Sequence, residues 1–109
     1  MTQTLTPMKL ISMTCEHSVA QRAMDLLQTL GVRSVRASEI RVEEFGNETV
    51  VDLLESQVKL EFLVRPEMVS NLLNQFSAKF LTRFDVGFYV TDAQVLRPEI
   101  FCTSESTAK

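Results

Sequence analysis

The sequence is poor in the residues that build metal centres and disulfide frameworks. Its 109 residues include no tryptophan, three glycines, three prolines, two cysteines and a single histidine, His17. A structural zinc site is usually recognised in a sequence by Cys-x-x-Cys pairs or clustered histidines, and this chain has neither. The sequence therefore predicts a protein without a metal site.

The chain also lacks an excess of positive charge and any long apolar run. Its 11 basic and 14 acidic residues give a net charge of −3, which provides no basic field for nucleic acid or anionic lipid. The apolar runs are too short to span a membrane, and the opening MTQTLTPMK does not resemble a secretory signal. We therefore expect a cytoplasmic protein that is not inserted in a membrane and does not bind nucleic acid. In that compartment Cys15 and Cys102 are expected to be reduced thiols.

The first half of the sequence predicts a strand, a helix and a second strand. MKLISMTC, residues 8–15, is a short and largely apolar run that predicts a buried strand, with a helix as the alternative. Ser18 is the expected N-cap of the following helix, and Gly31 the residue that closes it. The apolar stripe of this helix repeats at helical spacing: Val19, Ala23, Leu26, Leu27 and Leu30. The weak alternation of SVRASEIRV, residues 34–42, predicts the second strand.

The second half predicts a strand, a helix and one or two further strands. VKLEFLVR, residues 58–65, alternates apolar and charged side chains, as a half-buried strand does. Pro66 suits the first turn of a helix. The apolar stripe of that helix is Val69, Leu72, Leu73, Phe76 and Phe80. VGFYV, residues 86–90, predicts a fourth strand, and AQVLR, residues 93–97, a short additional strand after a turn at Thr91–Asp92.

The resulting order, β-α-β-β-α-β, predicts a single α+β domain of the ferredoxin-like type over residues 1–109. Residues 1–7 and 103–109 are expected to be disordered. The segment between the second and third strands, VEEFGNETVVDLLES (42–56), is much longer than the two to five residues of a usual hairpin loop. It combines five carboxylates with several apolar side chains. It is either a surface loop without a task or a functional arm.

Several stretches resemble the PII signalling superfamily. ETVVDLLESQVKLEFLV, residues 48–64, is similar to the PII pattern of a Tyr-Val-Val-Asp-Phe-Leu run leading into a Val-Lys-Ile-Glu strand. The PII-like regulators of bicarbonate transport, the SbtB type, and their carboxysome-associated relatives contain counterparts of four segments in the same order. In this chain the segments are VKLEFLV, AKFLTRFDVGFYV, DAQVL and IFC. This resemblance covers residues 8–102. It implies a trimer in which residues 42–56 form the long T-loop.

Several residues depart from the PII pattern, and these departures restrict the function and the ligand that the resemblance implies. Thr49 stands where uridylylated PII proteins carry a tyrosine, and Gln57 where nitrogen sensors carry a lysine. The phosphate-cradling segment retains only Gly87, in TRFDVGF, and no second cysteine follows Cys102 to form an SbtB-type redox loop. These differences imply a PII-like protein that is not a nitrogen sensor. Loss of the glycine-rich cradle favours AMP or ADP over ATP as the ligand.

The resemblance also implies a nucleotide site between neighbouring subunits. The residues expected beside the adenine and ribose are Arg36, Ser38 and Glu39, with Gly87 and Tyr89 on the partner side. The residues expected at the phosphates are Arg41, Lys59 and Arg97. Arg offers a planar fork of donors, Lys a compact charge, and Gly a close backbone approach.

Each assignment has a simpler structural alternative. Arg36 and Arg41 are equally compatible with a solvated strand edge, and Lys59 with an ion pair to Glu61. Gly87 is also compatible with a bulge or a packing notch.

An enzymatic role rests on one pair of residues, Cys15 and His17, which would share a face if both lay in a strand. No carboxylate in the sequence is placed to orient this pair, and Cys15 lies in a predicted core strand, so no catalytic residue is expected. Acylphosphatases share the topology but carry a phosphate-binding loop and an arginine directly after the first strand. CEHSVAQR does not match that pattern.

The sequence thus predicts a trimeric PII-like signalling protein that binds ADP or AMP. Bicarbonate is the second ligand that the carboxysome-associated relatives suggest, and the partner would be a bicarbonate transporter or a carboxysome-related protein. Trimer contacts are expected from apolar residues on the sheet face without helices, namely Ile11, Met13 and Leu63. The loop is expected to be mobile alone and to order with ligand. The alternative is a ferredoxin-like oligomer of the CutA or ACT type, structural or binding a small molecule other than a nucleotide.

Overall fold

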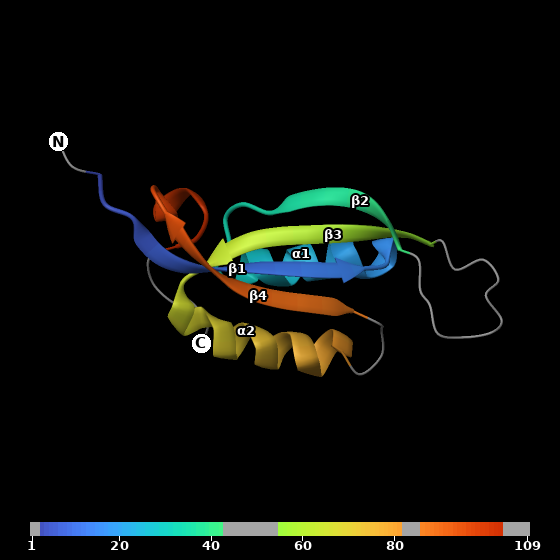
Figure 1. Cartoon of the computed structure of the whole chain (residues 1–109). Helices are drawn as coiled ribbons and strands as arrows, with labels where there is room; N and C mark the ends of the chain where they lie inside the picture. The colour runs from blue at the N-terminus through green and yellow to red at the C-terminus, as the bar shows by residue number, and fades with distance from the viewer. Residues whose placement is uncertain (1–2, 43–54, 82–85, 104–109) are drawn as a thin grey trace.

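The computed structural model describes residues 3–42, 55–81 and 86–103 of the chain. Over these residues, strands and helices follow the predicted order β-α-β-β-α-β (Figure 1). The elements are β1 (Thr6–Cys15), α1 (His17–Thr29), β2 (Arg36–Val42), β3 (Glu55–Val64), α2 (Val69–Phe76) and β4 (Gly87–Val95). Short helical turns flank α2 (Pro66–Met68 and Ser77–Leu81), and another follows β4 (Pro98–Ile100).

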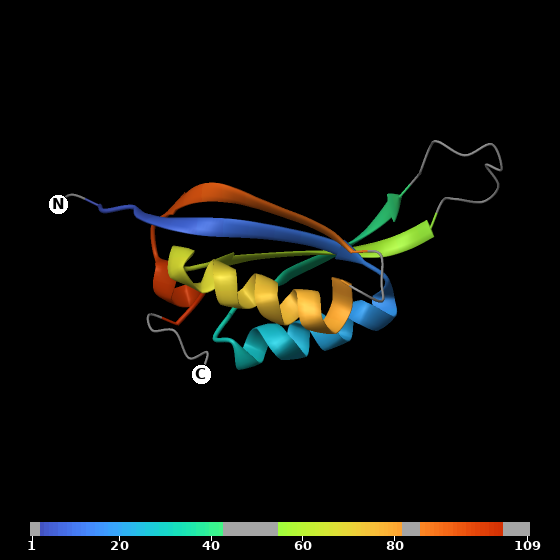
Figure 2. The same ribbon diagram turned by 90° about the horizontal axis from the view of Figure 1, so that it is seen from below.

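The four strands form one antiparallel sheet in the order β2-β3-β1-β4. Both helices pack on the same side of this sheet, as Figure 2 shows from below. This is the ferredoxin-like α+β arrangement predicted from the element order. Among the residues that the structure describes, no helix lies on the opposite side of the sheet, which we call the open face. Neither helix of the described chain is long and apolar enough to cross a membrane.

The hydrophobic core lies between the sheet and the two helices. The alternation predicted for β3 is confirmed, because Val58, Leu60, Phe62 and Val64 are all buried. From the helices, the fully buried side chains include Val19, Ala23, Leu27, Leu72 and Phe76. Burial of these apolar groups is the main stabilising contribution to a domain of this size. Pro66 opens the short turn that precedes α2, as predicted.

Of the two predictions for the ends of α1, the one for its C-terminal end is confirmed and the one for its N-terminal end is wrong. Gly31 adopts a φ of 98°, and Val32 N donates to Leu27 O at 3.0 Å, which is the helix-closing arrangement expected of a glycine. The N-cap prediction for Ser18 is wrong. The N–H groups of Val19 and Ala20 both donate to Glu16 O at 3.1 Å, so the helix already begins at His17.

The predicted turn at Thr91–Asp92 is also wrong. β4 continues without interruption to Val95, because β1 pairs with it along its whole length, from Thr14↔Gly87 to Thr6↔Val95. Lys9 lies opposite Asp92 in this ladder and forms an ion pair with it. Of the additional strand predicted at residues 93–97, residues 93–95 are therefore the end of β4, and residues 96 and 97 lie beyond it.

The predicted boundaries of the disordered segments need correction. Thr6 and Pro7 belong to β1, since they pair with Val95 and Gln94. Thr103 is held in place, because its N–H donates to Gly31 O at 3.0 Å. The ends of the predicted T-loop, 42 and 55–56, belong to β2 and β3. The remainder, 43–54, lies outside the described residues, and so do 104–109 and the predictions made for both segments.

The open face does not carry all the apolar residues expected there. Ile11 and Met13 are fully buried against the helices, so their assignment to the open face is wrong. Leu63 does lie on the open face, half-buried and opposite Leu10. Leu10 and Ile11 are adjacent apolar residues, and for this reason the sequence of β1 could not indicate which of its faces meets the helices.

Candidate functional site

Five of the eight predicted site residues lie together on the open face. Directly opposed residues of antiparallel strands project on the same side of a sheet, so the pairing register defines rows across it. The first row is Arg36, Glu61, Ser12 and Tyr89. The second row is Ser38, Lys59, Thr14 and Gly87. The two rows are adjacent along the strands and place Arg36, Ser38, Lys59, Gly87 and Tyr89 on one surface.

Glu61 connects the centre of this surface by polar contacts. Its Oε2 accepts a hydrogen bond from Ser12 Oγ at 3.3 Å and lies 3.5 Å from Lys59 Nζ. The Lys59–Glu61 ion pair considered as an alternative is therefore present, with both side chains about one-third exposed. Together with Arg36, the two rows hold two cations and one carboxylate. The surface keeps one positive charge that can attract an anion.

Gly87 is required by packing at the β4 edge of the open face. A Cβ at this position would lie 2.5 Å from Thr14 Oγ1, closer than side-chain atoms approach one another. The same Cβ would lie 3.9 Å from Tyr89 Oη. The packing-notch interpretation of Gly87 therefore fits the structure. Tyr89 itself is 58% exposed and projects from the same edge.

Arg36, at the opposite edge, makes a contact that the sequence did not indicate. Its guanidinium carbon lies 5.1 Å from the centroid of the Phe101 ring, which is a cation–π distance. Both side chains line a pocket of about 230 Å³ whose other walls are Leu10, Glu61, Phe62 and Leu63. Phe101 was missed because it is distant in sequence and belongs to no predicted element.

The remaining three predicted residues do not join this surface within one chain. Glu39 alternates to the other side of β2, and its Oε2 lies 3.3 Å from His17 Nε2 at the start of α1. Arg41 shares that side of the strand and is exposed. Arg97 follows β4 at the end of the sheet remote from Gly87, and it contacts Glu99 at 3.6 Å.

The two groups of residues on the open face occupy opposite edges of the sheet. Arg36 and Ser38 are on β2, whereas Gly87 and Tyr89 are on β4, with β3 and β1 between them. Three strand spacings amount to about 14 Å. Within one chain, a compact ligand therefore does not contact both edges. The predicted division of the site between subunits stays a prediction.

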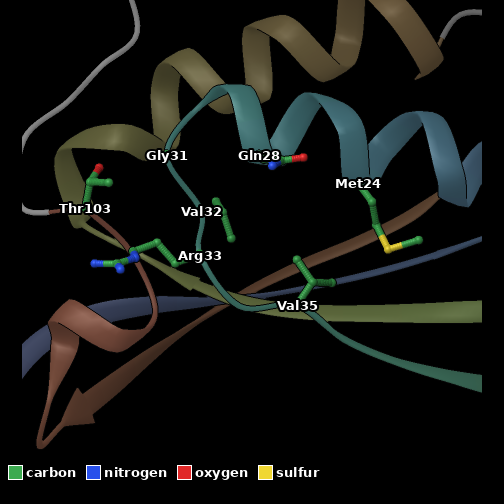
Figure 3. Close-up of a pocket in the computed structure, with 7 residues that line it drawn as sticks. All are labelled: Met24, Gln28, Gly31, Val32, Arg33, Val35 and Thr103. Atoms are coloured by element: carbon green, nitrogen blue, oxygen red, sulfur yellow. The ribbon is translucent and has the colours of Figure 1, made fainter.

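Two larger cavities lie elsewhere and include none of the predicted residues. One, of about 410 Å³, lies between α1 and the segment that leads into β2 (Figure 3). The other, of about 440 Å³, is a groove between α1 and the end of α2, lined by Arg22, Asp25, Leu26, Thr29, Lys79 and Phe80. The open face is the better candidate site, because Ser12 and Lys59 converge there on the Glu61 carboxylate through a hydrogen bond and an ion pair.

Cys15 and His17 do not form a nucleophile–base pair. β1 ends at Cys15 and α1 begins at His17, so the two side chains do not share a strand face. Burial raises the pKa of the Cys15 thiol, and the neighbouring Glu16 carboxylate raises it further. Both effects disfavour the reactive thiolate. Among the described residues, no group of three His, Cys, Asp or Glu side chains could hold a metal ion.

Comparison with solved structures identifies the fold. CPII from Thiomonas intermedia, solved with ADP, AMP and acetate, is 26% identical over 89% of this chain and 96% of its own, with a TM-score of 0.74. CPII solved with ADP and bicarbonate is 25% identical, covers 92% and 99%, and gives 0.75. A PII-like signalling protein from Thermus thermophilus is 23% identical, covers 90% and 98%, and gives 0.74.

The chain thus has the PII-like fold, and the resemblance to PII-like signalling proteins drawn from its sequence is confirmed. The narrower SbtB-type and carboxysome-associated assignment stays a prediction. Neither a protein-family model nor a curated protein sequence matches this chain.

Proposed function

We propose that this chain, which has the PII-like fold, is a signalling protein that binds ADP or AMP at the open face of its sheet. The observation that supports this most directly is the two-row arrangement of Arg36, Ser38 and Lys59 with Gly87 and Tyr89. A second support is that CPII, a protein of the same fold, has been solved with ADP and AMP.

The chemistry of the two rows suits a nucleotide with one or two phosphates. Arg36 offers a planar set of donors and Lys59 a compact charge, while Ser12 and Ser38 offer hydroxyl groups to a ribose. Only Gly87 is left of the glycine-rich phosphate cradle, which favours AMP or ADP over ATP. In this proposal Glu39, Arg41 and Arg97 act only where a neighbouring subunit brings them to the ligand.

We propose further that the protein is a homotrimer. Leu10 and Leu63 lie opposite each other and half-buried on the open face, and neither α1 nor α2 packs on that side of the sheet. In a closed ring, each β4 edge can meet the β2 edge of the next copy, which joins the two groups of site residues. The nucleotide would then bind between subunits.

The biological role that we propose is regulatory and not enzymatic. CPII has also been solved with ADP and bicarbonate, and this supports bicarbonate as a second ligand here. We propose that ligand binding in the cytoplasm reports on inorganic carbon, with a bicarbonate transporter or a carboxysome-related protein as the partner. The regulated process would be inorganic-carbon uptake or carbon fixation.

A thermal-shift panel tests the ligand class. AMP, ADP, ATP, cyclic AMP and an amino-acid mixture are each added with and without bicarbonate. We expect ADP or AMP to raise the melting temperature most, because a ligand of the native state stabilises it by RT ln(1 + [L]/Kd), about 2.7 kcal/mol at a hundredfold excess over Kd. A shift with amino acids alone would contradict the proposal and favour the CutA- or ACT-like alternative.

A charge substitution tests the location of the site. Lys59→Met should weaken ADP binding about 10- to 150-fold, since a hydrogen bond to a charged group contributes about 1.5–3 kcal/mol. Lys79→Met, which removes the same charge from the groove beside α2, is the matched control and should bind as the wild type does. Unchanged binding in Lys59→Met would remove the open face from the site.

A further inference from the structure

We propose that Phe101 is a positioning residue of the nucleotide site, whose ring holds the Arg36 guanidinium in its binding orientation. This inference rests on the proposed function, and it assigns a role to the segment that follows β4. Phe101 need not touch the ligand. Its effect on affinity would pass through Arg36.

The geometry of the pair leaves Arg36 free to bind. The guanidinium carbon lies over the Phe101 ring, 5.1 Å from its centroid, which is a cation–π distance. The N–H donors of arginine lie in the guanidinium plane and remain available to an anion or a ribose. Both residues line the pocket that also contains Leu10, Glu61 and Leu63, so the Arg36–Phe101 pair borders the open face.

The backbone around Phe101 is fixed by contacts with the segment that leads into β2. Arg33 N donates to Phe101 O at 2.9 Å, and Thr103 N donates to Gly31 O at 3.0 Å. Between these contacts, Cys102 is fully buried and forms an isolated β-bridge with Val32. Arg36 follows the same segment after two residues. Phe101 and Arg36 therefore belong to two backbone segments that are joined directly by hydrogen bonds close to both residues.

The Arg33 side chain adds a further contact between these two segments. Its Nη1 donates to Glu99 O at 3.2 Å, in the turn that precedes Phe101. Phe101 N itself donates to Pro98 O at 3.0 Å and closes that turn. The backbone of Phe101 is thus held by hydrogen bonds on both sides, independently of the contact between its ring and Arg36.

Contact with the Phe101 ring would raise the affinity for nucleotide by lowering the conformational entropy that Arg36 loses on binding. An arginine has several rotatable bonds, and their freedom is lost when the side chain is fixed against a ligand. If the Phe101 ring already restricts Arg36 in the free protein, less freedom is lost on binding. An aliphatic side chain at 101 would fill space but would not attract the cation.

The test is a double-mutant cycle on ADP affinity, measured by titration calorimetry with the full chain. Phe101→Leu should raise the Kd by about two- to fivefold, the range expected for an exposed cation–π contact. Phe101→Tyr, which keeps the ring, should bind as the wild type does. Arg36→Met should weaken binding, and adding Phe101→Leu to it should have no further effect. Ile100→Ala, at an exposed position of the preceding turn, is the control for disturbance of the segment.

Each outcome decides between the explanations. A normal Kd in Phe101→Leu or in Arg36→Met overturns the inference. An equal loss from Phe101→Leu in the wild-type and Arg36→Met proteins also overturns it, because Phe101 would then act on packing alone. Phe101→Met replaces Phe101→Leu if the latter melts early. Absence of ADP binding by the wild type overturns the proposed function, and this inference with it.

Discussion

Gly87 is the residue at which one methyl group should disturb the open face most. The Cβ of Gly87→Ala would lie 2.5 Å from Thr14 Oγ1, and Thr14 is a branched side chain on the neighbouring strand. Overpacking of this kind costs about 1–3 kcal/mol. We expect Gly87→Ala to lower the free energy of unfolding by this amount in urea denaturation. The loss should be much smaller in a Thr14→Ala background, and an equal loss in both backgrounds would contradict the packing explanation.

The two cysteine thiols should react slowly in the native protein. Cys15 and Cys102 are fully buried, and desolvation raises the pKa of both above the ordinary value of 9.0. Labelling with a thiol reagent near neutral pH should therefore be slow for both residues and become rapid in concentrated urea. Rapid labelling of either thiol without denaturant would contradict the burial seen here.

The same pKa shifts predict how stability depends on pH. Because the folded-state pKa of each thiol is raised, the unfolded chain releases its thiol protons first as the pH increases. The contribution of these groups is intact well below pH 9.0 and is lost as the pH rises through that value toward the folded-state pKa. The urea midpoint should fall in this range, and the fall should be smaller in Cys15→Ala.

At the scale of the elements, the end of α1 depends on the backbone conformation of Gly31. With a φ of 98°, Gly31 occupies the left-handed region, which costs other residues about 1–2 kcal/mol. Gly31→Ala should lower the free energy of unfolding by about this amount, and Gly31→Asn by less, because asparagine tolerates this region. Gln28→Ala, at an exposed position in the last turn, is the control and should change stability little. Equal stability of Gly31→Ala and the wild type would contradict the prediction.

Elements with a regular local pattern were predictable from the sequence, and those set by long-range pairing were not. The alternation at Val58, Leu60, Phe62 and Val64 indicated both β3 and its buried face. Thr91–Asp92 has the composition of a turn, yet pairing with β1 keeps it extended. Local propensity is a weak indicator where a neighbouring strand supplies the hydrogen bonds.

The candidate site shows the same division. The resemblance to PII-like proteins selected Arg36, Ser38 and Lys59, but their common face is evident only from the pairing register. Register also separates Glu39 and Arg41 from them, since neighbouring residues of a strand project on opposite sides. The Arg36–Phe101 contact had no sequence signal, because it depends on how the C-terminal segment folds back.

At the scale of the whole molecule, the open face should be an interface between copies of the chain. Leu63→Glu places a charge on this face, at a half-buried position opposite Leu10 that is not among the fully buried core residues. We expect this variant to remain folded but to sediment as a monomer, because a buried unpaired charge strongly opposes association. Ser70→Glu, on the exposed side of α2, is the matched control and should keep the assembly. Identical sedimentation of Leu63→Glu and the wild type would exclude the open face as the interface.

Native mass spectrometry of the wild-type protein with ADP reports both the subunit number and the bound nucleotide in one spectrum, and so tests the proposed ADP-binding trimer. A PII-like protein that binds its ligand between subunits should appear as a trimer that takes up as many as one ADP per subunit. The Lys59→Met trimer should take up less ADP at the same concentration. A monomer in the spectrum, or a trimer without ADP at saturating concentration, would contradict the proposed trimer that binds ADP between its subunits.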